Sequence, residues 1–291
     1  MDPIKSAQPD WLGACRHAVV AIREMLAQRS TIAQRVGETG TIGHGGDRTL
    51  EIDAAAEAIV FDELARLRAQ GHRFHAISEE RGSVDFTVPD DGPADAGPVP
   101  LVVIDPIDGS LNAKRGVTHH ALALAVAHGL TMADVVFGYV YEFGTGEEWR
   151  AELHHGAFLN DQPLDTSLEE HRVRDGRLEL VAVESVDPRR LQLAADALIS
   201  HVYRIRVLGA VAPALCQVAA ARLDGVVTMR RCRAVDAAAA QLIVREAGGH
   251  VSFPHVMPPL GAPLDIAPHS QVFAARSEST LRVLEAACLL P

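Results

Sequence analysis

Acidic side chains stand at the ends of the predicted elements, where a fold presents functional groups. They are Asp53, Glu79, Asp105, Asp108 and Asp236. Carboxylates gathered from several element ends repel one another unless a cation joins them. Hard divalent cations take oxygen ligands, and Mg²⁺ in particular is held by few carboxylates together with water and substrate phosphate. The acids therefore predict a divalent metal site.

The segment 105–112, DPIDGSLN, combines two acids with the start of a helix. Its proline fixes φ and favours an extended conformation for the residue before it. A turn of this kind can aim both carboxylates and the Ile107 carbonyl at one point, and free N–H groups at Gly109 and Ser110 attract an anion. Metal and phosphate sites side by side suit hydrolysis of a phosphate ester. The alternative is an ordinary turn, because Asp, Pro and Gly are common in turns.

Length, composition and charge restrict the class of protein. The chain has 291 residues with 48% hydrophobic content, enough for one domain of two lobes or for two domains. Its net charge is -11 and it has no basic stripe, which excludes nucleic acid and membrane surfaces as expected partners. No signal peptide is recognised, and the apolar run 121–127 is too short to span a bilayer. Four cysteines without metal-binding spacing indicate a reduced, cytoplasmic chain.

The elements that must position these acids follow from hydrophobic periodicity. Helices are expected over 11–34, 53–67, 188–201, 212–221 and 236–247. Strands are expected over 74–77, 101–104, 121–127, 135–141, 148–153, 178–183, 203–207 and 226–229. The Gly-rich segment Gly37–Asp47 is expected to be a mobile loop or lid. Alternation of strands and helices in the second half indicates an α/β layer with parallel strands, and the polar stretch 166–177 is the expected lobe boundary.

Three blocks in this order resemble the inositol monophosphatase family, within the lithium-sensitive, Mg²⁺-dependent phosphatase superfamily that includes fructose-1,6-bisphosphatase. They are Gly46–Glu57 with Ile77–Glu80, Asp105–Asn112, and Ala234–Ile243 with Glu246–Gly249. The resemblance covers most of the chain. It implies an α+β / α/β fold, a layered αβαβα sandwich of the sugar phosphatase type with the site between two lobes. An N-terminal α+β lobe, 1–170, would carry the lid and most metal ligands. A C-terminal α/β lobe, 171–291, would carry substrate contacts and Asp236.

The resemblance also implies residue roles and two or three Mg²⁺ ions per site. Glu79, Asp105 and the Ile107 carbonyl match ligands of a first metal. Asp105, Asp108 and Asp236 match ligands of a second. Asp53 and Ser110 match the pair that orients and deprotonates water, with Glu79 beside them in the catalytic set. The Gly109 and Ser110 N–H groups would hold the phosphate, and the segment 37–47 matches a lid that often supports a third metal. The implied substrate-binding residues are Lys114, Gly209, Ala210, Val211, Thr228 and Arg230.

The chain departs from the family pattern where the substrate is chosen. Thr228 stands where inositol-preferring members carry a Glu that grips a sugar hydroxyl, and Val235 replaces a packing Trp. An aromatic residue is replaced in the segment 112–115, which brings in Lys114 and Arg115. With Arg230 and Arg231 (the adjacent basic pair), these cations are candidates for holding a second phosphate. The alternative for Lys114 and Arg115 is a solvated turn.

The predicted function is a Mg²⁺-dependent phosphomonoesterase acting on a small polyol or sugar phosphate, with inositol 1-phosphate first. Fructose-1,6-bisphosphatase or dual activity is the alternative. A phosphatase for 3'-phosphoadenosine 5'-phosphate or histidinol phosphate, or a non-catalytic binding protein of this fold, remains open, although the complete carboxylate set argues against the last. A homodimer and lithium inhibition are implied by the resemblance alone. The pairs His119-His120 and His154-His155 are expected to be surface or packing residues, and Cys216 a core residue.

Overall fold

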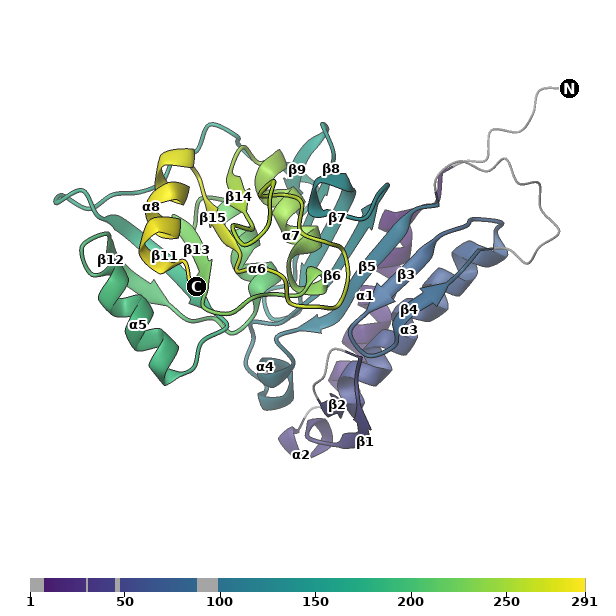
Figure 1. Ribbon diagram of the computed structural model, residues 1–291. Helices are drawn as coiled ribbons and strands as arrows, with labels where there is room; N and C mark the ends of the chain where they lie inside the picture. Colours follow the sequence, from purple (N-terminus) through teal and green to yellow (C-terminus); the bar gives the residue numbers. More distant parts are fainter. Residues whose placement is uncertain (1–7, 30, 45–47, 88–98, 291) are drawn as a thin grey trace, which may run out of the picture.

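Helices and sheets alternate in layers across the molecule (Figure 1). The computed structural model describes residues 8–29, 31–44, 48–87 and 99–290. Its helices are α1 (Trp11–Gln28), α2 (Ile32–Arg35), α3 (Glu51–Ala69), α4 (Ser110–Arg115), α5 (Pro188–Leu198), α6 (Val211–Ala219), α7 (Ala234–Glu246) and α8 (Glu278–Cys288). The order α1/α3, sheet, α6/α7, sheet, α5/α8 confirms the predicted αβαβα sandwich.

The first sheet is built from the N-terminal part of the chain. In spatial order its strands are β10 (Gln162–Pro163), β9 (Gly156–Leu159), β8 (Glu147–Glu152), β7 (Val135–Glu142), β6 (Ala121–Ala127), β5 (Leu101–Asp108), β3 (His75–Ser78) and β4 (Gly82–Asp85). The pair β3–β5 is parallel and the other neighbours are antiparallel. Every residue of β5 and of β6 is buried, because helices cover both faces of the sheet here.

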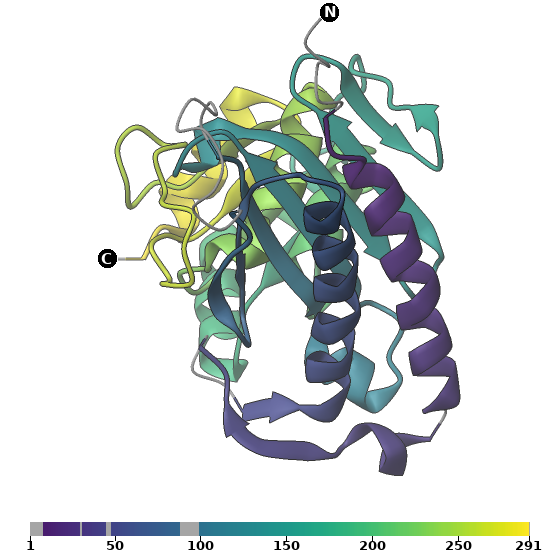
Figure 2. The same cartoon turned by 90° about the vertical axis from the view of Figure 1, so that its right-hand side faces the viewer.

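One face of this sheet is covered by α1 and α3, which run side by side in Figure 2. Their apolar stripes supply Ile22 and Ile52, which are fully buried with Ile104 of β5 and Tyr139 of β7. Burying such side chains is the main favourable term in folding. This packing fixes α3, and with it Asp53 in the first turn of that helix.

The opposite face is covered by α6 and α7, which lie between the two sheets. The alanines Ala237–Ala240 of α7 are all buried and let the helix approach the sheet closely. A Cβ atom at Gly138 of β7 would lie 2.5 Å from the carbonyl oxygen of Ala239, so glycine is required there. One core cluster joins residues of both sheets through these helices, so the second half of the chain places α7 against the first sheet.

The second sheet is built from the C-terminal part of the chain and is covered outside by α5 and α8. In spatial order its strands are β12 (Val202–Arg206), β11 (Leu178–Glu184), β13 (Gly225–Thr228), β15 (Phe273–Ala275) and β14 (His250–Ser252). The pairs β11–β12 and β11–β13 are parallel, which confirms the predicted α/β layer. No strand of either sheet falls within residues 166–177, where the sequence predicts the lobe boundary.

Two local predictions are wrong. The helix expected over 11–34 ends at Gln28, and α2 follows as a separate helix that begins after Thr31. The segment Gly37–Asp47, expected to be a loop, contains the strand β1 (Glu38–Ile42), which pairs antiparallel with β2 (Arg48–Leu50). Glycine disfavours a strand only weakly, so a high glycine content does not exclude one. The hydrogen bonds to β2 stabilise β1 in spite of its glycine. Positions 45–47 of the expected lid lie outside the described residues.

In the part of the chain that the structure describes, no helix has both the length and the apolar character needed to cross a membrane.

Candidate metal centre and active site

The segment that the sequence predicts as a turn after residue 104 is a bulged strand. β5 continues through Asp108, and its register against β6 shifts: Asp105 faces Ala123, whereas Asp108 faces Ala121. Three residues of β5 thus span two of β6, and such a bulge re-aims side chains and tolerates a proline. The Ile107 N–H donates to Asp105 Oδ1 at 3.0 Å, which fixes the carboxylate at the bulge.

Three of the predicted ligands meet in one cluster. Glu79, Asp105 and Asp236 each offer a carboxylate oxygen, and these oxygens lie within 4.8 Å of one another. Glu79 directly follows β3, and Asp105 lies on its parallel neighbour β5 just past the residue that pairs with Ser78, so the two acids lie side by side at the same end of these strands. Asp236 comes from the first turn of α7, where its Oδ2 accepts the Arg233 N–H at 3.0 Å.

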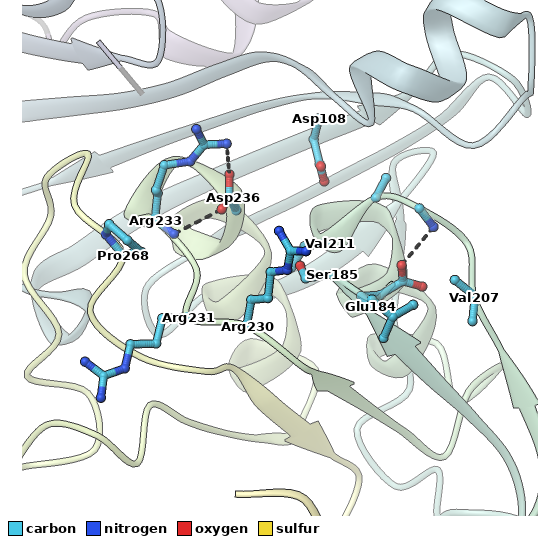
Figure 3. A pocket seen from close by; sticks show the side chains of 13 residues that line it. Asp108, Glu184, Ser185, Val207, Val211, Arg230, Arg231, Arg233, Asp236 and Pro268 are labelled. Carbon is cyan, nitrogen blue, oxygen red and sulfur yellow. Dashed lines mark hydrogen bonds and ion pairs between the residues drawn. The ribbon is translucent and has the colours of Figure 1, made fainter. Parts of the chain in front are cut away.

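The structure places Asp108 beside this cluster but outside it. Its Oδ2 accepts the Ala212 N–H at the start of α6, at 2.5 Å. Asp108 and Asp236 nevertheless project into the same space in Figure 3, from β5 and from α7. Ala121 and Ala123 lie on the same face of β6, so the bulge turns both β5 acids, which face these alanines, toward one side of the sheet.

The electrostatics of the site show a shortage of positive charge. Burial, and then the neighbouring carboxylates, raise the pKa values of Asp105 and Asp108 well above the ordinary range. Burial also raises the pKa of Glu79 to about 7, with Arg233 acting in the opposite direction. Buried acids with raised pKa values bind a cation that replaces their protons. The donor set of hard oxygens therefore fits a divalent metal ion.

Asp53 lies at the edge of the cluster and has a different environment. Burial, then Glu80 and Glu79, raise its pKa to about 7, while the Ser110 hydroxyl and the Leu50 backbone act in the opposite direction. Its Oδ1 atom is buried without a hydrogen-bond partner. Ser110, at the start of α4, donates its hydroxyl to the Ile107 carbonyl at 3.0 Å. The family resemblance pairs Asp53 with Ser110, and in the structure both line one cavity.

Arg233 belongs to the site, and sequence reasoning missed it. Its Nη1 donates to Glu79 Oε1 at 2.6 Å, and its Nη2 lies 3.4 Å from Asp236 Oδ1. A signal was available, because Arg233 precedes Asp236 by three residues, which is the spacing of a capping box at a helix start. The contact with Glu79, which is 154 residues away in the sequence, had no such signal.

Glu57 is a second missed residue and acts through the turn that carries Glu79. It is 2% exposed on α3 and accepts hydrogen bonds from the Ser78 hydroxyl and from Arg81 N (3.1 Å) and Nε (3.0 Å). These bonds hold the connection between β3 and β4 on both sides of Glu79. Glu80, the next residue, instead accepts from the Thr49 hydroxyl, so the two neighbouring acids face different partners.

Glu184, at the end of β11, holds in place the start of the segment 209–211, which the sequence predicts to bind substrate. Its two carboxylate oxygens accept the N–H groups of Leu208 and Gly209, each at 2.8 Å. Gly209 has a φ of 86°, and a Cβ atom there would lie 2.9 Å from Asn112 Nδ2. Asn112 in turn donates to the Leu208 carbonyl at 2.8 Å, which ties α4 to this segment.

Two adjoining cavities open on the site. One of about 390 Å³ is lined by the acidic cluster, Asp53, Gly109, Ser110 and Lys114. The other, of about 500 Å³, is lined by Glu184, Gly209, Ala210, Val211, Arg230 and Arg231 (Figure 3). Asp108, Gly209, Arg233 and Asp236 line both.

Thr228 is the predicted substrate residue that the structure does not bring to either cavity. It is fully buried at the end of β13, where its hydroxyl donates to the Arg230 carbonyl (3.0 Å) and accepts the Val272 N–H (2.8 Å). Both capacities of the hydroxyl are thus used within the fold.

The layered fold and the carboxylates of two layers around one cavity define a phosphatase of the sugar phosphatase type. The model of the inositol monophosphatase family matches residues 10–287, and the chain belongs to this family. It is a phosphoric monoester hydrolase of a generally metal-dependent family.

Curated relatives and solved structures agree with this assignment. The chain is 33% identical over 220 residues to a fructose-1,6-bisphosphatase/inositol-1-monophosphatase of Thermococcus kodakarensis, covering 75% of each chain. It is 31% identical over 216 residues to an inositol-1-monophosphatase of Mesorhizobium japonicum, covering 71% of this chain and 72% of that one. A solved inositol monophosphatase–fructose 1,6-bisphosphatase matches with a TM-score of 0.77 and 25% identity over 96% and 99% of the two chains.

Proposed function

We propose that the chain is a Mg²⁺-dependent phosphomonoesterase that hydrolyses inositol 1-phosphate by attack of water. The observation that carries this proposal is the cluster of Glu79, Asp105 and Asp236 at the cavity that also holds Asp53 and Ser110. Relatives named as inositol monophosphatases support the choice of substrate.

We assign two or three Mg²⁺ ions to the site, two of them to the carboxylates. Glu79, Asp105 and the Ile107 carbonyl would hold one, and Asp105, Asp108 and Asp236 the other. When bound, Mg²⁺ supplies polarisation of the phosphoryl group and a lower pKa for water. The raised pKa values of Asp105 and Asp108 support this assignment, because burial and neighbouring carboxylates disfavour their charged forms and a divalent cation would offset both.

Asp53 is the proposed general base. Burial raises the pKa of this carboxyl to about 7 in the metal-free site, which favours its taking up a proton from water. The Ser110 hydroxyl would orient the water, since its own proton is committed to the Ile107 carbonyl and its lone pairs can accept. The N–H groups of Gly109 and Ser110 would bind phosphate oxygens.

Fructose 1,6-bisphosphate is a second candidate, favoured by the cations around the cavities. Lys114 lines the cavity of the acidic cluster, and Arg230 and Arg231 line the adjoining one. Arg230 already pairs with Asp187 at 3.2 Å, so a second phosphate would compete with that carboxylate. Lys114→Ala should raise KM for the bisphosphate more than KM for inositol 1-phosphate. An equal rise for both would remove Lys114 from a second-phosphate role.

The test of the proposed function is phosphate release from inositol 1-phosphate and fructose 1,6-bisphosphate, measured with Mg²⁺ and with a chelator. The panel should include 3'-phosphoadenosine 5'-phosphate and histidinol phosphate. Metal-dependent release from inositol 1-phosphate above the others is the expected result. No metal-dependent release from any member would refute the proposal, and a preference for another member would change the substrate.

A homodimer in the cytoplasm, inhibited by lithium, completes the proposal. Four free, buried cysteines suit a reducing compartment. Light scattering of the purified protein measures the mass of the assembly, and adding Li⁺ to the phosphate assay measures the inhibition.

A further inference from the structure

Arg233 lies inside the acidic cluster rather than beside it. Its guanidinium donates to Glu79 and lies next to Asp236, two of the three clustered carboxylates, and Figure 3 shows it reaching over Asp236 from the start of α7. The three side chains are 20%, 17% and 15% exposed, so water screens their charges only partly. The third clustered acid, Asp105, also acts electrostatically on Arg233.

The contact joins parts of the fold that are distant in the sequence. Glu79 follows β3 of the first sheet, and Arg233 precedes α7 in the second half of the chain, 154 residues away. An arginine with a planar fork of donors suits a partly buried site of this kind. Arg233 therefore links the first sheet to the start of α7 at the place where a metal ion would otherwise neutralise the acids of both.

We propose that Arg233 is an internal counter-cation of the metal centre: it neutralises and holds Glu79 and Asp236 in the metal-free enzyme, and divalent metal binding displaces it from them. This inference rests on the metal requirement of the proposed function. Its consequence is that Arg233 sets the metal affinity of the centre, because binding includes the loss of the arginine contacts and works against a fixed positive charge a few atoms away.

The test is direct titration of metal-free protein with Mg²⁺ in the absence of substrate, by calorimetry. Arg233→Met keeps side-chain length and removes the charge, and the Kd for Mg²⁺ should fall by about tenfold or more. Arg231→Met is the matched control: it makes the same change two residues away, on an exposed side chain that points away from Asp236 in Figure 3. Its Kd should stay within about twofold of wild type.

A second readout separates this role from a simple structural one. Without metal, Arg233→Met leaves Glu79, Asp105 and Asp236 without their cation, so its Tm should fall. Saturating Mg²⁺ should remove most of the deficit, which makes the Tm gain from Mg²⁺ larger than in the wild type. Arg233→Lys keeps the charge and should restore the Kd toward the wild-type value. A variant that folds only with Mg²⁺ supports the proposal, whereas one that stays unfolded at saturating Mg²⁺ counts against it.

Other results overturn the inference in distinguishable ways. An unchanged or weaker Mg²⁺ affinity in Arg233→Met, with a normal wild-type titration, refutes the counter-cation role and leaves the proposed function standing. A raised KM for the phosphate ester with an unchanged Kd for Mg²⁺ would make Arg233 a substrate ligand instead. A wild-type protein that binds no Mg²⁺ would refute the metal assignment itself.

Discussion

Replacing Glu184 with Gln should change stability by an amount that depends on pH. Glu184 is fully buried, and burial raises its pKa from 4.5 to about 7, against the two N–H groups that lower it. A rise of this size corresponds to about 3 kcal/mol. Between these two pKa values the unfolded chain releases a proton that the folded chain keeps. The wild type therefore loses stability as pH rises through this window, and the loss is complete above pH ~7.

The glutamine variant has no such titration but has a fixed defect. Its amide oxygen can accept one of the two N–H groups, from Leu208 or Gly209, while its NH₂ group faces the other. Leaving one buried N–H without a partner costs about 1–3 kcal/mol. At pH 5 the variant should therefore be less stable than the wild type by roughly this amount. At pH 8 the wild type carries a buried charge. The stability that this charge costs the wild type then nearly equals the stability that the unpaired N–H group costs the variant.

The assay is urea unfolding of metal-free protein at several pH values between 5 and 8. Glu179→Gln is the control, since Glu179 lies on the same strand and is exposed. Its stability should run parallel to that of the wild type. If the difference between Glu184→Gln and the wild type were constant from pH 5 to pH 8, the reasoning from a buried, titrating Glu184 would be refuted.

Two further substitutions test the site. Asp108→Asn should lower kcat at limiting Mg²⁺ by about 100-fold or more. Its Tm should stay unchanged, because the amide oxygen can still accept the Ala212 N–H. A near-wild-type rate at low Mg²⁺ would contradict the ligand assignment. Glu57→Gln should cost about 1–3 kcal/mol in urea unfolding and weaken Mg²⁺ binding by about tenfold, because Arg81 and Ser78 lose a buried anionic acceptor beside Glu79. Calorimetry showing unchanged Mg²⁺ affinity would separate Glu57 from the metal centre.

Local sequence patterns were sufficient for most elements. The apolar runs of β5 and β6 predict buried strands, and both strands are buried because helices cover both faces of the sheet. The alternation of strands and helices predicts the α/β layer that β11, β12 and β13 form. The same patterns failed at β1, whose five residues are all exposed. A strand with no buried face has no hydrophobic signal, and only its partner β2 defines it.

The sequence by itself determined the chemistry of the protein: its acids stand at element ends, and their types and order carry the resemblance to a metal-dependent phosphatase family. The tertiary structure decided which groups touch. It put Asp105 and Asp108 on one face of the sheet through a bulge, used the Thr228 hydroxyl inside the fold, and brought Arg233 to Glu79. The physical reason is that sequence patterns report only on local structure. Periodicity records which face of an element is buried, whereas contacts between residues 154 positions apart depend on how α7 packs against the first sheet.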